Sequence, residues 1–135
     1  PVVSRPDDSP KILVVDDSVD GAEMLATALS AKGYDTRVAH DAAVALRIAA
    51  NFRPDVALLD IGLPVMDGYE LASHVRADAR LADIPIVMIT SRVGEKHRAR
   101  AIEIGVNDYL GKPYQENQLL DAIEPLVEAR RREVS

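Results

Sequence analysis

Short apolar runs recur along the chain, each too short to form a helix and rich in branched side chains. Three of them, at 12–15, 56–59 and 86–89, contain no polar residue. Unbroken runs of this kind are typical of central strands in a parallel sheet that is covered on both faces. A weaker run at 36–39 and a short one at 108–110 suit the two edges of such a sheet. The pattern therefore predicts five strands.

Between these runs the apolar residues follow the period of an α-helix. After each of the first two strands, apolar residues stand at i, i+3, i+4 and i+7, in stripes that begin at Ala22 and Ala45. Asp41 is a candidate N-cap for the second of these helices. Three further helices are predicted over 69–77, over 95–104 and from Gln115 onward. Pro125 falls inside the last one, so we expect a kink or an early end there.

Strand and helix alternate five times, which is the pattern of an α/β fold. Right-handed crossovers and two weak edge strands predict a single doubly wound (βα)5 flavodoxin-like domain, with a five-stranded parallel sheet in the order 2-1-3-4-5. A length of 135 residues is enough for one such core. We expect residues 1–10 to be a disordered lead-in or linker, 11–130 to form the domain, and 131–135 to be a C-terminal tail.

The composition of the chain argues against several classes of function. The chain has 22 acidic and 16 basic residues, a formal net charge of −6, no Trp and one Phe, so neither charge nor stacking favours direct binding of nucleic acid. The absence of Cys excludes disulfides and thiol catalysis and fits a cytoplasmic protein. No apolar run approaches the roughly 18 residues that span a bilayer, so we expect no membrane association.

Chemically active side chains follow the predicted strands where each strand ends. Asp16 and Asp17 follow the first strand, Asp60 the third, Thr90 ends the fourth, and Lys112 comes just after the fifth. Ligands of doubly wound sheets bind outside the carboxyl ends of the strands. We therefore expect these side chains to face one crevice.

Each of these residues also has a structural explanation. Asp16 and Asp17 would serve as capping residues of the next helix, Asp60 as part of a turn, Thr90 as a satisfied hydroxyl and Lys112 as a solvated charge. Taken together these explanations fail, because three carboxylates at one sheet edge repel one another by several kcal/mol per close pair. A divalent cation would offset that repulsion. We interpret Asp67 and Gly68 only as the turn and N-cap of the third helix.

The candidate ligands are all oxygens, which favours Mg²⁺, with Mn²⁺ as a possibility, over zinc. The three histidines, at positions 40, 74 and 97, have no metal-ligand spacing and are expected at the surface. A metal ion beside a carboxylate, a hydroxyl and an ammonium is a set of groups suited to phosphoryl transfer. The segment 105–112 does not match a phosphate-binding glycine loop, which argues against a nucleotide site.

Four motifs of the sequence together resemble those of a known protein family. They are Val14-Val15-Asp16-Asp17, the stretch from Leu58 through Asp60 to Gly68, Pro85 to Thr90, and Asn107 to Pro113. In order and spacing they resemble the receiver domain of two-component response regulators, with the chemotaxis-regulator-like fold, over residues 11 to about 130. More narrowly, the stretch from Thr90 to Glu116 resembles the terminal receiver of hybrid histidine kinases.

The resemblance implies a role for each site residue. Asp60 would accept a phosphoryl group from the phosphohistidine of a histidine kinase. Asp17 and Asp60 would bind Mg²⁺ with the backbone carbonyl of Gly62, and Asp16 would act largely through metal-bound water. Thr90 and Lys112 would contact phosphoryl oxygens. The family also suggests a cis peptide between Lys112 and Pro113.

The resemblance further implies a switch that phosphorylates and dephosphorylates itself, rather than a turnover enzyme. Thr90 and Tyr109 would move together on phosphorylation. The basic fourth helix, with Lys96 and Arg98, would form a partner face with Tyr109. The expected partners are a sensor histidine kinase or phosphotransfer domain and a downstream protein, and a homodimer is possible.

Two other functions remain open from the sequence. One is a Mg²⁺-dependent phosphohydrolase with an aspartyl-phosphate intermediate, which would need a general acid and a substrate-covering segment. The other is a flavodoxin-like mononucleotide-binding module.

Overall fold

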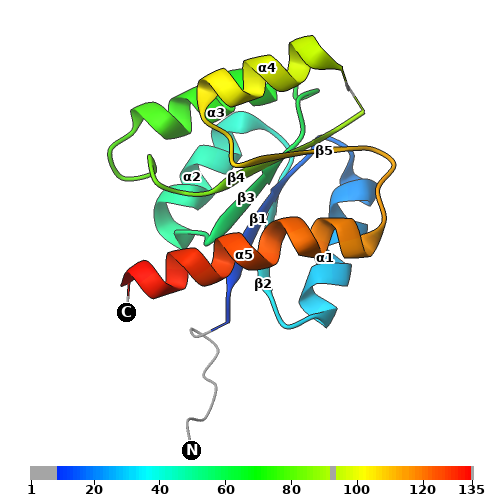
Figure 1. Ribbon diagram of the computed structural model, residues 1–135, viewed down its shortest axis with the longest axis vertical. Helices are drawn as coiled ribbons and strands as arrows, with labels where there is room; N and C mark the ends of the chain where they lie inside the picture. Colours follow the sequence, from blue (N-terminus) through cyan, green and yellow to red (C-terminus); the bar gives the residue numbers. More distant parts are fainter. Residues whose placement is uncertain (1–8, 92–93, 135) are drawn as a thin grey trace, which may run out of the picture.

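The computed structural model describes residues 9–91 and 94–134, so most of the expected lead-in lies outside the described residues. Within these described residues, ten elements alternate between strand and helix (Figure 1). The elements are β1 (Lys11–Val15), α1 (Val19–Ala31), β2 (Asp35–Ala39), α2 (Ala42–Phe52), β3 (Val56–Leu59), α3 (Gly68–Ala77), β4 (Ile86–Thr90), α4 (Glu95–Ile104), β5 (Asp108–Gly111) and α5 (Glu116–Val134). The strands are all parallel and lie in the order β2-β1-β3-β4-β5. The predicted fold class is confirmed.

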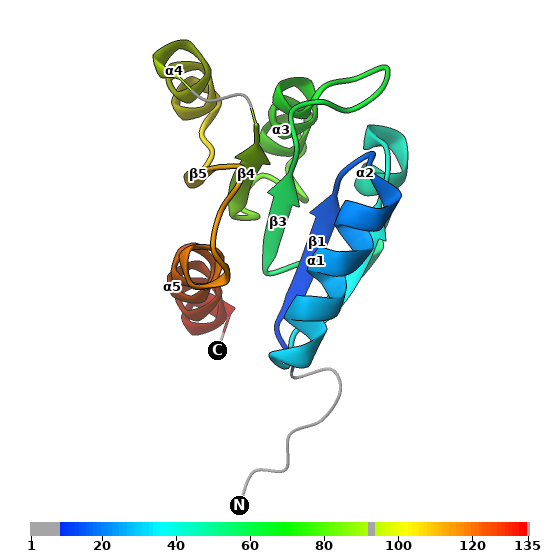
Figure 2. The same ribbon diagram turned by 90° about the vertical axis from the view of Figure 1, so that its right-hand side faces the viewer.

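The apolar strands divide their side chains between two cores, because successive residues of a strand point to opposite faces. Figure 2 shows α1 and α5 on one face of the sheet and α2, α3 and α4 on the other. Ile12 and Val14 of β1 belong to the first core, whereas Leu13 and Val15 belong to the second. Burial on both faces explains why the runs 12–15 of β1, 56–59 of β3 and 86–89 of β4 contain no polar residue.

The helix starts follow local capping chemistry. Asp41 and Asp67 cap α2 and α3, each accepting a backbone N–H three residues later, as predicted. The N-cap of α1 is Ser18, whose hydroxyl accepts the N–H of Gly21. Neither Asp16 nor Asp17 is therefore the N-cap of α1, although Oδ1 of Asp16 accepts the backbone N–H of the N-cap residue Ser18.

Helix α5 continues through Pro125 to Val134, so the early end that we considered does not occur. An interior proline costs roughly 3 kcal/mol. Leu119, Ile123 and Val127 lie on both sides of Pro125 and are all buried against the sheet. Burial of an aliphatic side chain contributes roughly 1.5–3 kcal/mol, so packing offsets the proline. None of the described helices is long and apolar enough to cross a membrane.

The end of α5 is fastened to the edge of the sheet opposite the candidate site. Asp55, buried just before β3, accepts the backbone N–H of Lys11 at 2.8 Å and a guanidinium N–H of Arg131 at 3.2 Å. Arg131 also donates to the backbone carbonyl of Ser9 at 2.9 Å. Residues 131–134, which we expected to be a tail, thus continue the helix.

Candidate functional site

Three carboxylates meet at the carboxyl end of the sheet. Asp16 and Asp17 follow β1, Asp60 follows β3, and these two strands are neighbours in the sheet. One carboxylate oxygen from each of the three residues lies within 4.8 Å of the others. Asp16 and Asp60 are half-buried and Asp17 is exposed. The set offers only hard oxygen ligands, which suits Mg²⁺ or Mn²⁺.

Lys112 supplies the positive charge of this cluster. Its ammonium lies 3.0 Å from Oδ2 of Asp16 and 3.5 Å from Oδ2 of Asp60. Partial burial by itself lowers the pKa of Lys112, but the hydrogen bond to Asp16 and the charges of Asp60 and Asp16 together raise this pKa above its ordinary value. Lys112 therefore stays charged at neutral pH. One ammonium leaves three carboxylates with a net negative charge, which favours a cation.

Two further contacts hold Asp16 in place. Its Oδ1 accepts the backbone N–H of Ser18 at 2.9 Å, and its backbone carbonyl accepts Nδ1–H of His40 at 2.9 Å. His40 is half-buried at the end of β2, so the expectation that it is a plain surface residue is wrong. The signal in the sequence was its place directly after a strand, at the same edge as the acids.

The loop after Asp60 is built from tight turns. The N–H of Leu63 donates to the carbonyl of Ile61 at 2.9 Å, and the N–H of Met66 donates to the carbonyl of Pro64 at 2.7 Å. Hydrogen bonds between residues i and i+2 define γ-turns. The N–H of Gly62 points back to Oδ1 of Asp60 at 3.4 Å.

Gly68 lets α3 begin directly against the backbone of Asp60. A Cβ at this position would collide with the carbonyl oxygen of Asp60 and lie 2.8 Å from Cα of Ile61. The N–H of Gly68 bonds to the carbonyl of Ile61 at 2.9 Å. Our sequence interpretation assigned Gly68 only to a turn. The pair Asp-Gly before a helix could not distinguish a turn from this close approach, which needs the tertiary structure.

Thr90 ends β4 beside β5 and is 1 % exposed. Its backbone carbonyl accepts the N–H of Lys112 at 2.8 Å, so β4 positions the residue that carries the ammonium. The peptide between Lys112 and Pro113 is cis, as the resemblance suggested. The acids, the amine and the end of β4 thus share one edge of the sheet.

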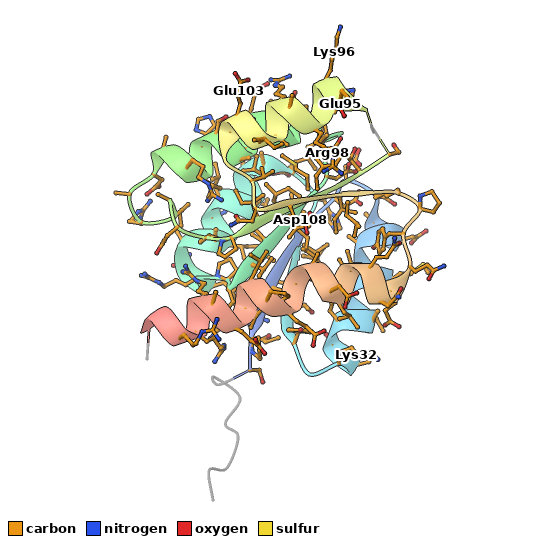
Figure 3. The ribbon with its side chains drawn as sticks, viewed as in Figure 1. Lys32, Glu95, Lys96, Arg98, Glu103 and Asp108 are labelled. Carbon is orange, nitrogen blue, oxygen red and sulfur yellow. The ribbon has the colours of Figure 1, made fainter. Side chains whose placement is uncertain are left out.

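The predicted partner face lies apart from the acids. Tyr109 of β5 is buried, and the guanidinium carbon of Arg98 lies 5.7 Å from the centre of its ring. Figure 3 shows Arg98 turned toward β5 and Lys96 pointing away from the sheet. His97 is also not a plain surface residue, since its Nδ1 lies 2.8 Å from the hydroxyl of the buried Tyr69. His74 is exposed, as expected.

An open cleft of about 540 Å³ adjoins the acids. Leu25 of α1 and Tyr114, which precedes α5, contribute apolar surface, and Asp16, Asp60 and Lys112 line the same cleft. A reagent in solution can therefore approach the Asp60 carboxylate.

A parallel sheet in this order is that of a doubly wound α/β domain, and here it carries an acidic cluster and a lysine at its carboxyl edge. The family described as "Response regulator receiver domain" matches residues 12–124, and the chain belongs to that family.

The chain is similar to several curated regulators. It is 34 % identical over 116 residues to the phosphate regulon transcriptional regulatory protein PhoB of Pseudomonas aeruginosa, a match that covers 86 % of this chain and 51 % of that protein. It is 39 % identical over 110 residues to the DNA-binding response regulator MtrA of Mycobacterium leprae, with 82 % and 48 % covered. The chain therefore spans about half the length of these relatives.

Solved structures extend the similarity. The receiver domain of a signal transduction histidine kinase from Syntrophus aciditrophicus superimposes with a TM-score of 0.82 at 30 % identity, covering 90 % of this chain and 92 % of that one. The receiver domain of a Pseudomonas aeruginosa sensor histidine kinase, which has a magnesium ion coordinated in its active site cleft, gives a TM-score of 0.81 at 29 % identity, covering 89 % and 98 %.

Proposed function

We propose that the chain is a phosphoacceptor switch in which Asp60 receives a phosphoryl group from the phosphohistidine of a histidine kinase or phosphotransfer domain. The observation that carries this proposal is the meeting of three carboxylates and one ammonium beside an open cleft. In the transfer, an oxygen of Asp60 attacks phosphorus, a P–O bond forms and the P–N bond breaks. The electron pair of that bond stays on the histidine nitrogen.

We propose Mg²⁺, or Mn²⁺, as the cofactor, held by Asp17, Asp60 and the backbone carbonyl of Gly62, with Asp16 acting largely through metal-bound water. A bound divalent cation would neutralise charge that develops on the phosphoryl oxygens. The oxygen-only donor set supports this assignment. The magnesium ion in the similar kinase receiver is further support.

The chain's own residues have separable roles in this proposal. Lys112 already pairs with Asp60 and would pair with a phosphoryl oxygen after transfer. The hydroxyl of Thr90 would reach another oxygen, and Tyr109 would follow it, which changes the surface of α4 and β5. Such a coupling biases a two-state element by one new charged group.

We further propose that this changed surface, with Lys96, Arg98 and Tyr109, docks a downstream protein or a second copy of the chain in the cytoplasm. Residues 11–130 would act as the switching unit. The DNA-binding activity named for MtrA belongs to that longer protein. Direct nucleic-acid binding by this acidic chain is not part of our proposal. A receiver that acts in this way is compatible with a transcription regulator and with a hybrid histidine kinase.

Intact mass after incubation with phosphoramidate and Mg²⁺ tests the proposal. We expect one added phosphoryl group on the wild-type chain, none on Asp60→Asn, and a normal yield on the control Asp121→Asn, which alters an exposed acid of α5. Asp17→Ala should abolish the dependence on Mg²⁺. An unchanged yield in Asp60→Asn would refute the assignment. Rapid turnover of a small phosphomonoester would instead favour the phosphohydrolase.

A further inference from the structure

Helix α4 buries little apolar surface. Among its described residues, Glu95–Ile104, Ala101 alone is buried, whereas α3 buries five residues. Gly94, at the N-cap of α4, has no side chain that could accept a backbone N–H of the first turn. Most of the stability of a helix in a protein comes from the packing of its apolar face. The position of α4 on the domain therefore depends on other contacts.

Two of these contacts join α4 to Tyr69, the second residue of α3. The Tyr69 hydroxyl lies 2.8 Å from Nδ1 of His97 and 3.4 Å from the backbone carbonyl oxygen of His97. The guanidinium carbon of Arg100 lies 4.2 Å from the centre of the Tyr69 ring, which is within the range of a cation–π contact. Tyr69 is 2 % exposed, so water competes little for these contacts. One buried side chain of α3 thus holds two residues of α4 that lie one turn apart.

The backbone next to Tyr69 is in contact with Asp60. Tyr69 follows Gly68, whose backbone lies so close to Asp60 that a Cβ would collide with the Asp60 carbonyl oxygen. The N–H of Gly68 also donates to the carbonyl of Ile61 at 2.9 Å. Backbone atoms in such contact cannot rotate aside, so a shift of the peptide after Asp60 also shifts the first turn of α3. The contacts therefore form a continuous path from Asp60 through Gly68 and Tyr69 to α4.

This path is separate from the coupling of Thr90 to Tyr109. The guanidinium of Arg98 on α4 lies over the ring of Tyr109, which belongs to β5. Figure 2 shows α4 beside α3 and above β5. Two tyrosines from two different elements thus contact α4. Tyr109 lies on the strand next to the one that Thr90 ends, and Tyr69 lies on the helix that begins against Asp60.

We propose that Tyr69 is a positioning residue that couples the backbone of Asp60 to α4, through the hydrogen bond between its hydroxyl and His97. This inference rests on the proposed function, because it takes Asp60 as the phosphoacceptor and α4 as the helix that responds. Tyr69 acts through the backbone of Gly68 and not on the phosphoryl group itself. The coupling is reciprocal, since a shift at Asp60 moves α4 and a restraint on α4 resists that shift.

The test measures how far phosphorylation of Asp60 changes hydrogen exchange in α4. Mass spectrometry follows the exchange of peptides that contain Glu95–Ile104, with and without phosphoramidate in a buffer that contains Mg²⁺. Intact mass gives the phosphorylated fraction of each sample. Asp60→Asn in the same buffers should show no change in α4, which ties the response to the phosphoacceptor. Thermal unfolding gives the Tm of every variant.

Four variants separate the hydrogen bond from the bulk of the side chains. Tyr69→Phe keeps the ring and its contact with Arg100 but removes the hydroxyl, and His97→Ala removes the partner of that hydroxyl. His97→Asn is the rescue variant, because its amide is attached to Cγ, as Nδ1 of histidine is, and offers both a donor and an acceptor. Tyr34→Phe is the matched control, since Tyr34 packs against the core on the other face of the sheet.

In the wild-type chain we expect phosphorylation to change the exchange rate of α4 about tenfold, a coupling within the usual range for two linked sites. Tyr69→Phe and His97→Ala should each reduce this change to about threefold or less. The double variant should match the single variants, since all three lack the same hydrogen bond. His97→Asn should restore most of the change, and Tyr34→Phe should retain all of it.

A purely structural role for Tyr69 would give a different result. Loosening of α4 alone would lower the Tm and raise its exchange by the same factor with and without phosphorylation, so the ratio of the two rates would stay as in wild type. That unchanged ratio in either Tyr69→Phe or His97→Ala would overturn the inference. So would a His97→Asn variant that behaves as His97→Ala does, or an equal loss in Tyr34→Phe.

Failure of the proposed function gives a separate result in the wild-type chain. Asp60 would then take up no phosphoryl group, or α4 would exchange at the same rate in both buffers. Either result would remove the inference together with the function on which it rests. A wild-type response that persists in Tyr69→Phe would instead leave Asp60 as phosphoacceptor and exclude only the path through Tyr69.

Discussion

Replacement of Gly68 by alanine tests whether α3 must begin in contact with the backbone of Asp60. The added Cβ would collide with the carbonyl oxygen of Asp60, and it would lie 2.8 Å from Cα of Ile61 and 2.9 Å from the carbonyl carbon of Asp60. All three neighbours are backbone atoms, which cannot rotate aside as a flexible side chain can. Either the first turn of α3 or the peptide after Asp60 must move.

The expected cost follows from these contacts. Overpacking of a tightly packed site costs about 1–3 kcal/mol, and rigid neighbours place Gly68→Ala in the upper part of that range. Alanine returns at most about 1 kcal/mol of helix propensity, and less at the first residue of a helix. The net loss is about 2 kcal/mol. At about 4 °C per kcal/mol for a domain of this size, the Tm should fall by about 8 °C.

Gly62→Ala is the matched control, because it lies in the same loop and a Cβ there meets nothing within 4 Å. Its Tm should change by less than about 2 °C, as expected for a substitution within about 0.5 kcal/mol. Calorimetry measures the Tm of both variants, and the yield of phosphorylated protein reports whether Asp60 keeps its position. If Gly68→Ala unfolds at the same temperature as Gly62→Ala, the close approach of α3 to the Asp60 backbone is not real.

Three further predictions follow from single contacts. The guanidinium of Arg76 donates to the carbonyls of Ala82, Ile84 and Gly105 and to the amide oxygen of Asn107. The ammonium of Arg76→Lys cannot make all of these hydrogen bonds, so this variant should lower the free energy of unfolding in urea by about 2 kcal/mol. His40→Ala removes the donor to the Asp16 carbonyl and should weaken Mg²⁺ binding on the order of tenfold by calorimetry; wild-type affinity would show that this contact does not position the site. Against the lowering effect of burial, the hydrogen bond to Asp16 and the charges of Asp60 and Asp16 raise the pKa of Lys112 above its ordinary value of 10.5 in the folded protein. In metal-free buffer its stabilising contribution is therefore fully present below about pH 10.5 and is lost as the pH rises through the folded pKa. The difference in unfolding free energy between wild type and Lys112→Gln should thus be constant from about pH 7 to 10 and shrink above that; a decline already below pH 9 would contradict the ion pairs.

The sequence pattern predicted the strands and the helix N-caps, because both depend on residues that are close together in the sequence. The apolar runs of β1, β3 and β4 are required by burial on both faces, and the caps Asp41 and Asp67 act on N–H groups only three residues away. The positions of the acids and of Lys112 at the ends of predicted strands indicated that they would meet at the sheet edge. The meeting of Asp16, Asp17 and Asp60 within 4.8 Å follows from the adjacency of β1 and β3.

Features that depend on tertiary packing were missed. No local rule indicates that α5 passes through Pro125, since the compensation comes from Leu119 and Val127 packing on the sheet. The bond from His40 to Asp16 joins residues 24 positions apart in sequence and needs β2 to lie beside β1. The turn at Val65, where φ is 68°, could not be predicted from local preference either, because a positive φ is an outlier for a β-branched residue.

The central claim is that Asp60 accepts the phosphoryl group beside a divalent cation. Tandem mass spectrometry of acid-protease peptides, prepared at low pH after incubation with phosphoramidate, locates the modified residue directly. With Mg²⁺ present the phosphoryl group should appear on Asp60 alone, and with a chelator it should be nearly absent. Phosphorylation at another residue, or equal modification of Asp60 in the chelator, would contradict the account.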